Sequence, residues 1–182
     1  MNAFALFGVS IVASFLSSAV AARGFVWPHL QKIEPNRALT ALVAPHLFLR
    51  FIGLSFLVPG VVSPLLSVGF AAPAAYGDFI AGLLAIVATL ALVNRTSWAT
   101  ASVWLFNIWG AADLVFAFYQ GRKLGIQPGM LGATFFIVTA LVPPLLVTHI
   151  LIFRLLVGRQ PATEPERGQR LEHAGLPSRR GR

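Results

Sequence analysis

Six polar side chains lie inside long apolar stretches of this sequence. A charged side chain in hydrocarbon costs several kcal/mol unless it is paired or hydrated, so such residues are the first candidates for a functional site. Five of them are ionisable and one is an amide: His46, Arg50, Asp78, Asp113, His149 and Asn107.

Arg50 and two of the aspartates fall at similar heights if the apolar stretches cross a membrane as helices. Asp78 and Asp113 each lie about 15 residues, or about 22 Å, from the same end of the bundle, and the long Arg50 side chain starts slightly lower. This spacing predicts a cluster of the three residues. Two interpretations stay open, a buried ion pair that locks helices together or a ligand or proton site built on it. With two acids and one base, one aspartate is expected to keep a proton or to face water.

His46 and His149 form a second candidate site. They lie about seven and eight residues from the same end of their helices and are therefore predicted to be level. Two level imidazoles could ligate a b-type haem or form part of a metal site. The alternative is a pair of hydrogen-bonded histidines, which the lack of acidic residues at that level favours. We therefore expect no bound haem or metal.

Asn107 belongs to a segment that mixes polar, aromatic and small side chains on one helix. Residues 106–113 read Phe-Asn-Ile-Trp-Gly-Ala-Ala-Asp. Small residues let a neighbouring helix approach closely, and Asn and Asp offer hydrogen bonds. The segment is therefore predicted to form one wall of a pocket.

The absence of cysteine and of known motifs excludes several classes of function. A chain without cysteine has no disulfide, no thiolate nucleophile and no Cys-ligated zinc or iron–sulfur cluster. No P-loop, nucleophile elbow or zincin helix is present, so an enzyme is the less expected class. The net charge is +8, but the basic residues flank apolar stretches without interleaved aromatic residues. Nucleic acid is therefore not an expected partner.

The elements that carry these residues are five apolar stretches. Hydrophobic residues make up 57% of the chain and charged ones 11%, against roughly 25% charged in a soluble domain. Each stretch is near or above the ~20 residues needed to cross a bilayer. The sequence thus predicts an all-α integral membrane protein, a bundle of five transmembrane helices with the fifth kinked at Pro143-Pro144. The stretches cover residues 3–22, 39–62, 74–93, 98–119 and 130–157.

Domain organisation and orientation follow from composition and charge. Residues 1–158 are expected to form the transmembrane domain, and residues 159–182 a disordered, basic cytoplasmic tail. Eleven Lys and Arg residues, among them Arg23, Lys32 and Arg37 in the first loop, fall on the side of the C-terminus, against two on the other. The positive-inside rule predicts a cytoplasmic C-terminus, an external N-terminus and an uncleaved first helix in a cell membrane, specifically a bacterial inner membrane.

Three functions remain open for such a chain. The favoured one is a binding or accessory protein that holds a small apolar or amphipathic ligand, a membrane partner or a second copy near Arg50, Asp78 and Asp113. The first alternative is an electron-transfer protein with a b-type haem between His46 and His149. The second is a small proton-coupled carrier, disfavoured because no internal repeat is detectable.

Overall fold

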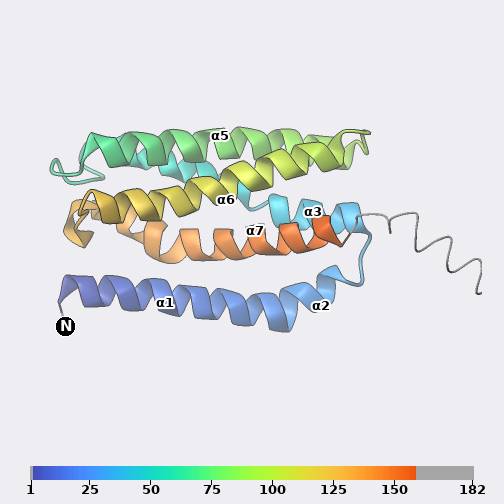
Figure 1. The fold of residues 1–182 in the computed structure, drawn as a ribbon, viewed down its shortest axis with the longest axis horizontal. Coiled ribbons are helices and arrows are strands. Elements are labelled where there is room, and N and C mark those ends of the chain that lie inside the picture. Colours follow the sequence, from blue (N-terminus) through green and yellow to red (C-terminus); the bar gives the residue numbers. More distant parts are fainter. Residues whose placement is uncertain (1, 159–182) are drawn as a thin grey trace, which may run out of the picture.

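The structure, a computed structural model, describes residues 2–158, and its regular secondary structure in that range is helical. The predicted disordered tail, residues 159–182, lies outside the described residues. The long helices run along a common axis (Figure 1). Within the described range the predicted all-α class is confirmed, with five helices long and apolar enough to cross a membrane. They cover Ala3–Leu30, Pro35–Leu57, Val68–Val93, Ala99–Lys123 and Gly132–Val157.

The first long helix extends further than the sequence predicts. α1 (Ala3–Ala21) continues through a π-helical turn, η1 (Ala22–Val26), into α2 (Trp27–Leu30). Arg23 therefore lies within the helix and not in a loop. The apolar run resumes after Arg23, and Pro28 occupies the first turn of α2, where a missing N–H is tolerated.

The second long helix is made of three pieces: α3 (Pro35–Val43), α4 (His46–Leu49) and the 3₁₀ helix η2 (Arg50–Leu57). It begins four residues before the predicted start, because the Glu34 carboxylate caps α3 by accepting two backbone N–H bonds at 3.1 Å. Pro45 lies at the break between α3 and α4.

α5 (Val68–Val93) also begins earlier than predicted, with Pro73 inside it. The Ser67 hydroxyl caps the helix by accepting from the Gly69 N–H at 3.2 Å. Pro73 has no N–H to donate to the Gly69 carbonyl, four residues earlier. The Gln120 side-chain amide of the next helix donates to that carbonyl instead, at 3.4 Å. A side chain of α6 thus compensates for the missing N–H of Pro73. The sequence around Pro73 does not indicate this compensation.

The fifth long helix is divided just before its proline pair. Pro143 and Pro144 lie in the first turn of α7, directly after a π-helical turn. Neither proline can donate to a carbonyl of the preceding turn, which accounts for the irregular winding there. The remaining elements are α6 (Ala99–Lys123), η3 (Pro128–Met130), η4 (Gly132–Thr134), η5 (Ile137–Leu141) and α7 (Val142–Val157).

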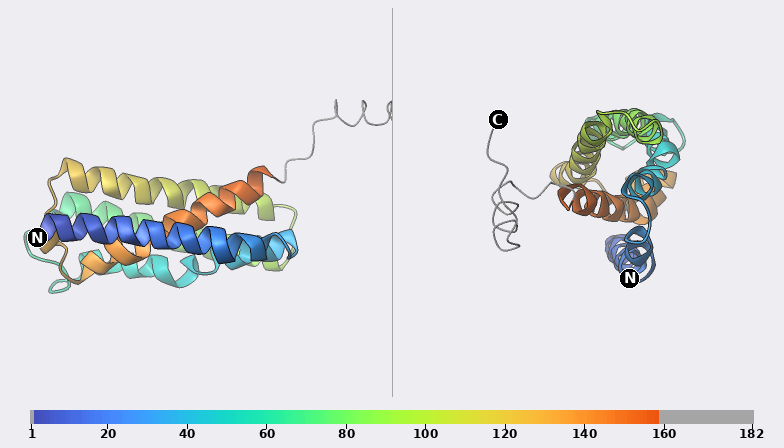
Figure 2. Two further views of the ribbon diagram at one scale, coloured as in Figure 1. Left: turned by 90° about the horizontal axis from the view of Figure 1, so that it is seen from below. Right: turned by 90° about the vertical axis from the view of Figure 1, so that its right-hand side faces the viewer.

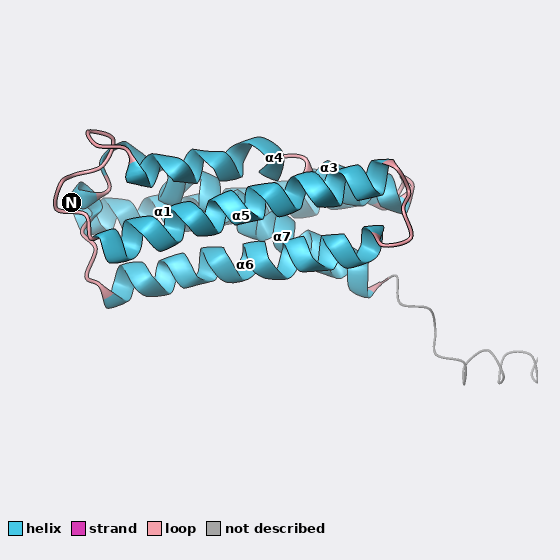
Figure 3. Cartoon of the chain, turned by 90° about the horizontal axis from the view of Figure 1, so that it is seen from above, coloured by secondary structure: helices cyan, strands magenta, loops and turns pink. Residues whose placement is uncertain are grey.

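Four of the long helices surround a common interior, and α1 lies outside them. The end-on view shows α1 beside α7 and away from the other helices (Figure 2). α5 packs between the second long helix and α6 (Figure 3). No residue of α1 is buried. The interior is therefore formed by the second to fifth helices, and α1 covers one side of it.

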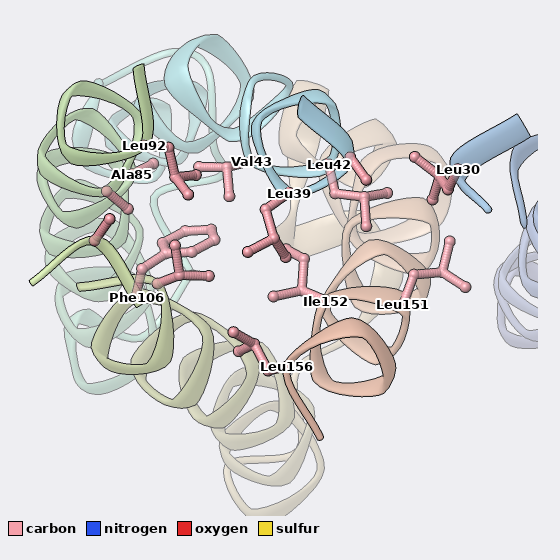
Figure 4. Close-up of a cluster of buried hydrophobic side chains, with 14 of the residues drawn as sticks. Leu30, Leu39, Leu42, Val43, Ala85, Leu92, Phe106, Leu151, Ile152 and Leu156 are labelled. Atoms are coloured by element: carbon pink, nitrogen blue, oxygen red, sulfur yellow. The ribbon is translucent and has the colours of Figure 1, made fainter. Parts of the chain in front are cut away.

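A polar layer divides the apolar core into two clusters. One cluster fills the end that carries α2 and contains side chains of α2, α3, α5, α6 and α7 (Figure 4). The other fills the end that carries the α6–α7 connection. Between them lie side chains that are at most 7% exposed: His46, Arg50, Asp78, Asn107 and His149.

Candidate functional site

Arg50 lies in this polar layer, at the point where the second long helix changes its winding. α4 ends at Leu49, and the 3₁₀ helix η2 begins at Arg50 and continues for eight residues. Such helices rarely exceed three or four residues, and a long one often marks strain or a hinge. Arg50 is completely buried. A buried guanidinium is affordable only if its N–H groups have acceptors.

One terminal nitrogen of Arg50 binds both aspartates. Nη1 donates to Oδ1 of Asp78 at 2.5 Å and to Oδ2 of Asp113 at 3.0 Å. Arg50 thereby joins the second long helix to α5 and α6. The predicted contact between Arg50 and the aspartates is confirmed.

The remaining N–H groups of Arg50 bind α6, α7 and its own helix. Nη2 donates to the Gly110 carbonyl at 2.6 Å and contacts Nε2 of His149 at 2.9 Å. Nε donates to Nδ1 of His46 at 3.4 Å. Together with the two carboxylates, these acceptors use all five N–H groups of the guanidinium.

The two histidines belong to the Arg50 cluster, which corrects the prediction of a separate second site. Their other ring nitrogens are also bonded: Nδ1 of His149 to Oδ1 of Asn107 at 2.7 Å, and Nε2 of His46 to Oγ1 of Thr148 at 2.9 Å. Arg50 can only donate, so the ring nitrogen facing it accepts. The opposite nitrogen then carries the hydrogen, and the network is satisfied with both imidazoles neutral.

This arrangement does not fit a haem between the histidines. A bis-histidine haem needs one free nitrogen of each imidazole, directed at the iron from opposite faces of the porphyrin. The His46 and His149 ring centroids are 4.6 Å apart, and all four ring nitrogens have protein partners. Within residues 2–158, no group of three or more His, Cys, Asp or Glu side chains is placed to hold a metal ion.

Two glycines let the carboxylates pack against neighbouring backbone. A Cβ atom at Gly53 would overlap the Asp78 carboxylate, and one at Gly77 would overlap that of Asp113. Any larger residue would displace these groups from Arg50. The positions of the carboxylates are thus fixed by the backbone as well as by the ion pairs.

An apolar cavity of about 530 Å³ reaches the polar layer from the end that carries the α6–α7 connection. Its acidic lining residues are Asp78 and Asp113, each with 10% of its side chain accessible. α1 covers part of it through Phe7 and Gly8. Phenylalanines from several helices form much of the wall: Phe4, Phe7, Phe56, Phe70 and Phe118.

The cavity runs along α5 and α6. Phe70 and Asp78 are eight residues apart on α5, and Asp113 and Gly121 are eight apart on α6; all four line the cavity. Eight residues of helix correspond to about 12 Å. The carboxylates therefore lie at the inner end, and Arg122 lines the opposite end.

The sequence indicates the residues at the inner end of the cavity but not those of its walls. Of the predicted pocket segment 106–113, only Asp113 lines the cavity. Asn107 is fully buried beneath it and donates to the His149 carbonyl at 3.2 Å. Ala117 and Gly121 follow Asp113 at four-residue intervals along α6 and also line the cavity, so the helical period indicates this part of the wall. Phenylalanines brought together from separate helices leave no such pattern.

Residues 6–157 match the model of a family described as Domain of unknown function (DUF8737). No curated protein and no solved structure matches the chain.

Proposed function

The chain belongs to this DUF8737 family, and from the geometry of the site we propose that it is an integral membrane protein that binds a small amphipathic molecule inside its helical bundle. The apolar part of the molecule occupies the cavity, and its polar head reaches Asp78 and Asp113. The observation that carries the proposal is an apolar cavity with two accessible carboxylates at its inner end.

The outer surface of the bundle supports membrane insertion. Many large apolar side chains are more than half exposed there, and in water such a surface would aggregate. They occur on every long helix, for example Leu16, Phe48, Val93, Leu105 and Ile150. Contact with the hydrocarbon of a bilayer would stabilise these exposed apolar side chains.

Charge at the two ends of the bundle supports the orientation. Among the described residues, the end opposite the cavity carries Arg23, Lys32, Arg37, Arg95 and Arg154. The cavity end carries only Arg122 and Lys123 in the same range. The positive-inside rule puts the basic end in the cytoplasm, so the cavity lies in the outer half of a cell membrane.

The size and polarity of the cavity suit a small ligand. Ligand sites commonly have volumes of about 300–1,000 Å³, apolar walls and a few polar groups that fix orientation. A length of about 12 Å suits a short alkyl chain or a compact ring system. We assign no reaction to the site.

Two other functions can be tested on the same preparation. A Soret absorption band in the purified protein would favour the haem protein, although the histidine geometry gives it no support. Accumulation of a ligand in proteoliposomes driven by a pH gradient would favour a proton-coupled carrier.

A matched pair of glycine substitutions on the first long helix tests the binding function. Gly8 lines the cavity, Gly24 does not, and a Cβ atom at either position meets no atom within 4 Å. Gly8→Leu therefore adds a side chain at the wall of the cavity, whereas Gly24→Leu adds the same side chain elsewhere.

Binding of radiolabelled 1-octanol is measured with the protein in lipid nanodiscs, and empty nanodiscs give the background. We expect saturable binding that Gly8→Leu weakens at least tenfold and Gly24→Leu leaves unchanged. Absence of saturable binding, or equal losses in both variants, contradicts the proposal.

A further inference from the structure

We propose that the ligand is a monovalent organic cation with an apolar body, and that its binding displaces one proton from the Asp78–Asp113 pair. This inference rests on the proposed binding function and specifies the chemistry of the same site. It follows from the charge of the cluster, the free carboxylate oxygens and the composition of the cavity wall.

The cluster has one negative charge in excess when both aspartates are ionised. Arg50 contributes one positive charge and the aspartates two negative ones, while the hydrogen bonds of the histidines are satisfied by neutral rings. An uncompensated charge is costly in a low-dielectric interior. A proton on one carboxylate, or a bound cation beside the pair, removes that cost.

Each aspartate has one oxygen that Arg50 does not use. Asp78 bonds Arg50 through Oδ1 and Asp113 through Oδ2. The other oxygen of each makes no hydrogen bond within the described residues, yet both side chains line the cavity and keep some accessible surface. Oδ2 of Asp78 lies against Gly53, and Oδ1 of Asp113 lies against Gly77. A cationic or proton-donating head would therefore meet the accessible surface of the two carboxylates at the inner end of the cavity.

The charged groups around the pair favour a cation at the inner end of the cavity. Arg50 on η2 faces the pair from below with its donors occupied, together with His46 of α4 and His149 of α7. Arg122 lies at the opposite end, about 14 Å along α6 from Asp113. Arg122 repels a cationic head at the outer end of the cavity, and the two carboxylates attract it at the inner end. An anionic head at the inner end would be repelled by the same carboxylates.

The wall of the cavity also suits an organic cation. Aromatic faces attract ammonium groups, more strongly when the charge is desolvated. Phe56 and Phe70, whose rings contact each other at 5.6 Å, line the cavity together with Phe7 and Phe118. Quaternary and protonated amines with apolar substituents match both the wall and the carboxylates.

The exchange balances in charge and protons. Before binding, the cluster holds Arg50 as a cation, one ionised aspartate and one protonated aspartate, and is neutral. A monovalent cation enters, the protonated carboxylate loses its proton to solvent, and the occupied cluster is again neutral. Linkage then requires that acid weakens cation binding, by about tenfold per pH unit where the carboxylate is protonated.

The test compares three probes with eight-carbon chains in nanodiscs: octyltrimethylammonium, 1-octanol and octanoate. Calorimetric titration in two buffers with different ionisation enthalpies gives affinity and proton release together. At pH 8 we expect the cation to bind at least tenfold more tightly than the alcohol, and octanoate more weakly than both. As the pH is lowered from 8 to 5, the affinity for the cation should fall, and the number of protons released per cation bound should rise towards one.

Asp113→Asn identifies the source of the proton. It keeps the Arg50–Asp78 ion pair and hence a neutral cluster, so the variant should fold. It should abolish proton release and reduce the preference for the cation over the alcohol at least tenfold. Glu34→Gln, the same loss of charge at the other end of the bundle, should change neither. Proton release that persists in Asp113→Asn would assign the proton to another group, such as a histidine, and overturn the inference.

The outcomes separate the two proposals. If octyltrimethylammonium binds no more tightly than 1-octanol and releases no proton, the cation inference fails while the binding function stands. If none of the three probes binds saturably, the binding function itself fails, and the cation inference with it.

Discussion

At the residue scale, Arg50 holds the helical bundle together by saturating its own donors. Its five N–H groups reach two carboxylates, a backbone carbonyl and two imidazoles on four long helices. A lysine has only three donors at a single point and could not replace this planar fork. The structural and the functional interpretations of the cluster are therefore compatible, because Arg50 fixes the aspartates and both of their side chains line the cavity.

Removal of Arg50 should destabilise the protein strongly. Arg50→Ala leaves two carboxylates buried without their counter-ion, and breaking such a pair costs about 3–5 kcal/mol. Arg50→Lys should recover only part of this loss. The unfolding free energy in mixed detergent micelles measures both effects, and Arg23→Ala, an exposed arginine of the first long helix, is the control.

A double-mutant cycle isolates the ion pair from packing effects. Adding Asp78→Asn to Arg50→Ala removes one of the orphaned charges and should regain part of the lost stability. If the double variant loses as much unfolding free energy as the two single variants together, Arg50 and Asp78 are not energetically coupled, although they are in contact.

The contact between Arg50 and the aspartates could be predicted from sequence, but the place of the histidines could not. The predicted heights of His46 and Arg50 depend on a helix start at residue 39, whereas α3 begins at Pro35. The earlier start moves His46 and Arg50 four residues, about 6 Å, further into the bundle. The long guanidinium then spans the remaining distance between the imidazoles and the carboxylates. A four-residue error in the predicted start of the second long helix is therefore enough to make the histidines and the Arg50 cluster look like two separate sites.

At the element scale, irregular helices shape the cavity and α1 closes it. The wall includes the π turn η5 and the 3₁₀ helix η2, both of which result from features that length and hydropathy do not reveal. α1 has no buried residue, although its Phe7 packs against Phe135 at 5.6 Å between ring centroids. At the other end of the first long helix, Trp27 of α2 is covered by Arg154, whose guanidinium lies 4.1 Å from the centre of the ring. A ligand that enters between α1 and the other helices would have to displace the cavity end of α1 from these contacts.

Cross-linking should show whether this movement admits ligand. The chain has no cysteine, so Phe7→Cys with Phe135→Cys introduces a single pair. We expect a short, reducible bis-maleimide cross-linker to join the pair and to slow dissociation of bound octyltrimethylammonium at least severalfold, with recovery on reduction. Val12→Cys with Phe135→Cys is the control, because Val12 is 58% exposed on α1 and does not line the cavity. An unchanged dissociation rate in the joined protein would mean that ligand reaches the cavity without displacing α1.

At the scale of the whole molecule, the polar layer separates two ends with different roles. The end with most of the described basic residues is packed with apolar side chains, and the other end holds the cavity. The number of long helices and their alternating directions could be predicted from hydropathy and length alone. The position of α1 outside the other four could not, because its apolar residues are as numerous as those of a buried helix. A bilayer tolerates both placements, so composition does not distinguish them.

The orientation of the whole molecule decides which compartment the cavity serves. The topology predicted from sequence assigns eleven basic residues to the side of the C-terminus and two to the cavity side, and this bias predicts a cytoplasmic C-terminus and an external N-terminus. A fluorescent protein fused to the C-terminus should therefore fluoresce, and a phosphatase that is active only outside the cytoplasm should be inactive there. Fusions after Gly125, in the α6–α7 turn at the cavity end, should give the opposite pair of results. Strong phosphatase activity at the C-terminus would reverse the orientation, and the cavity with its carboxylates would then face cytoplasmic ligands and cytoplasmic pH.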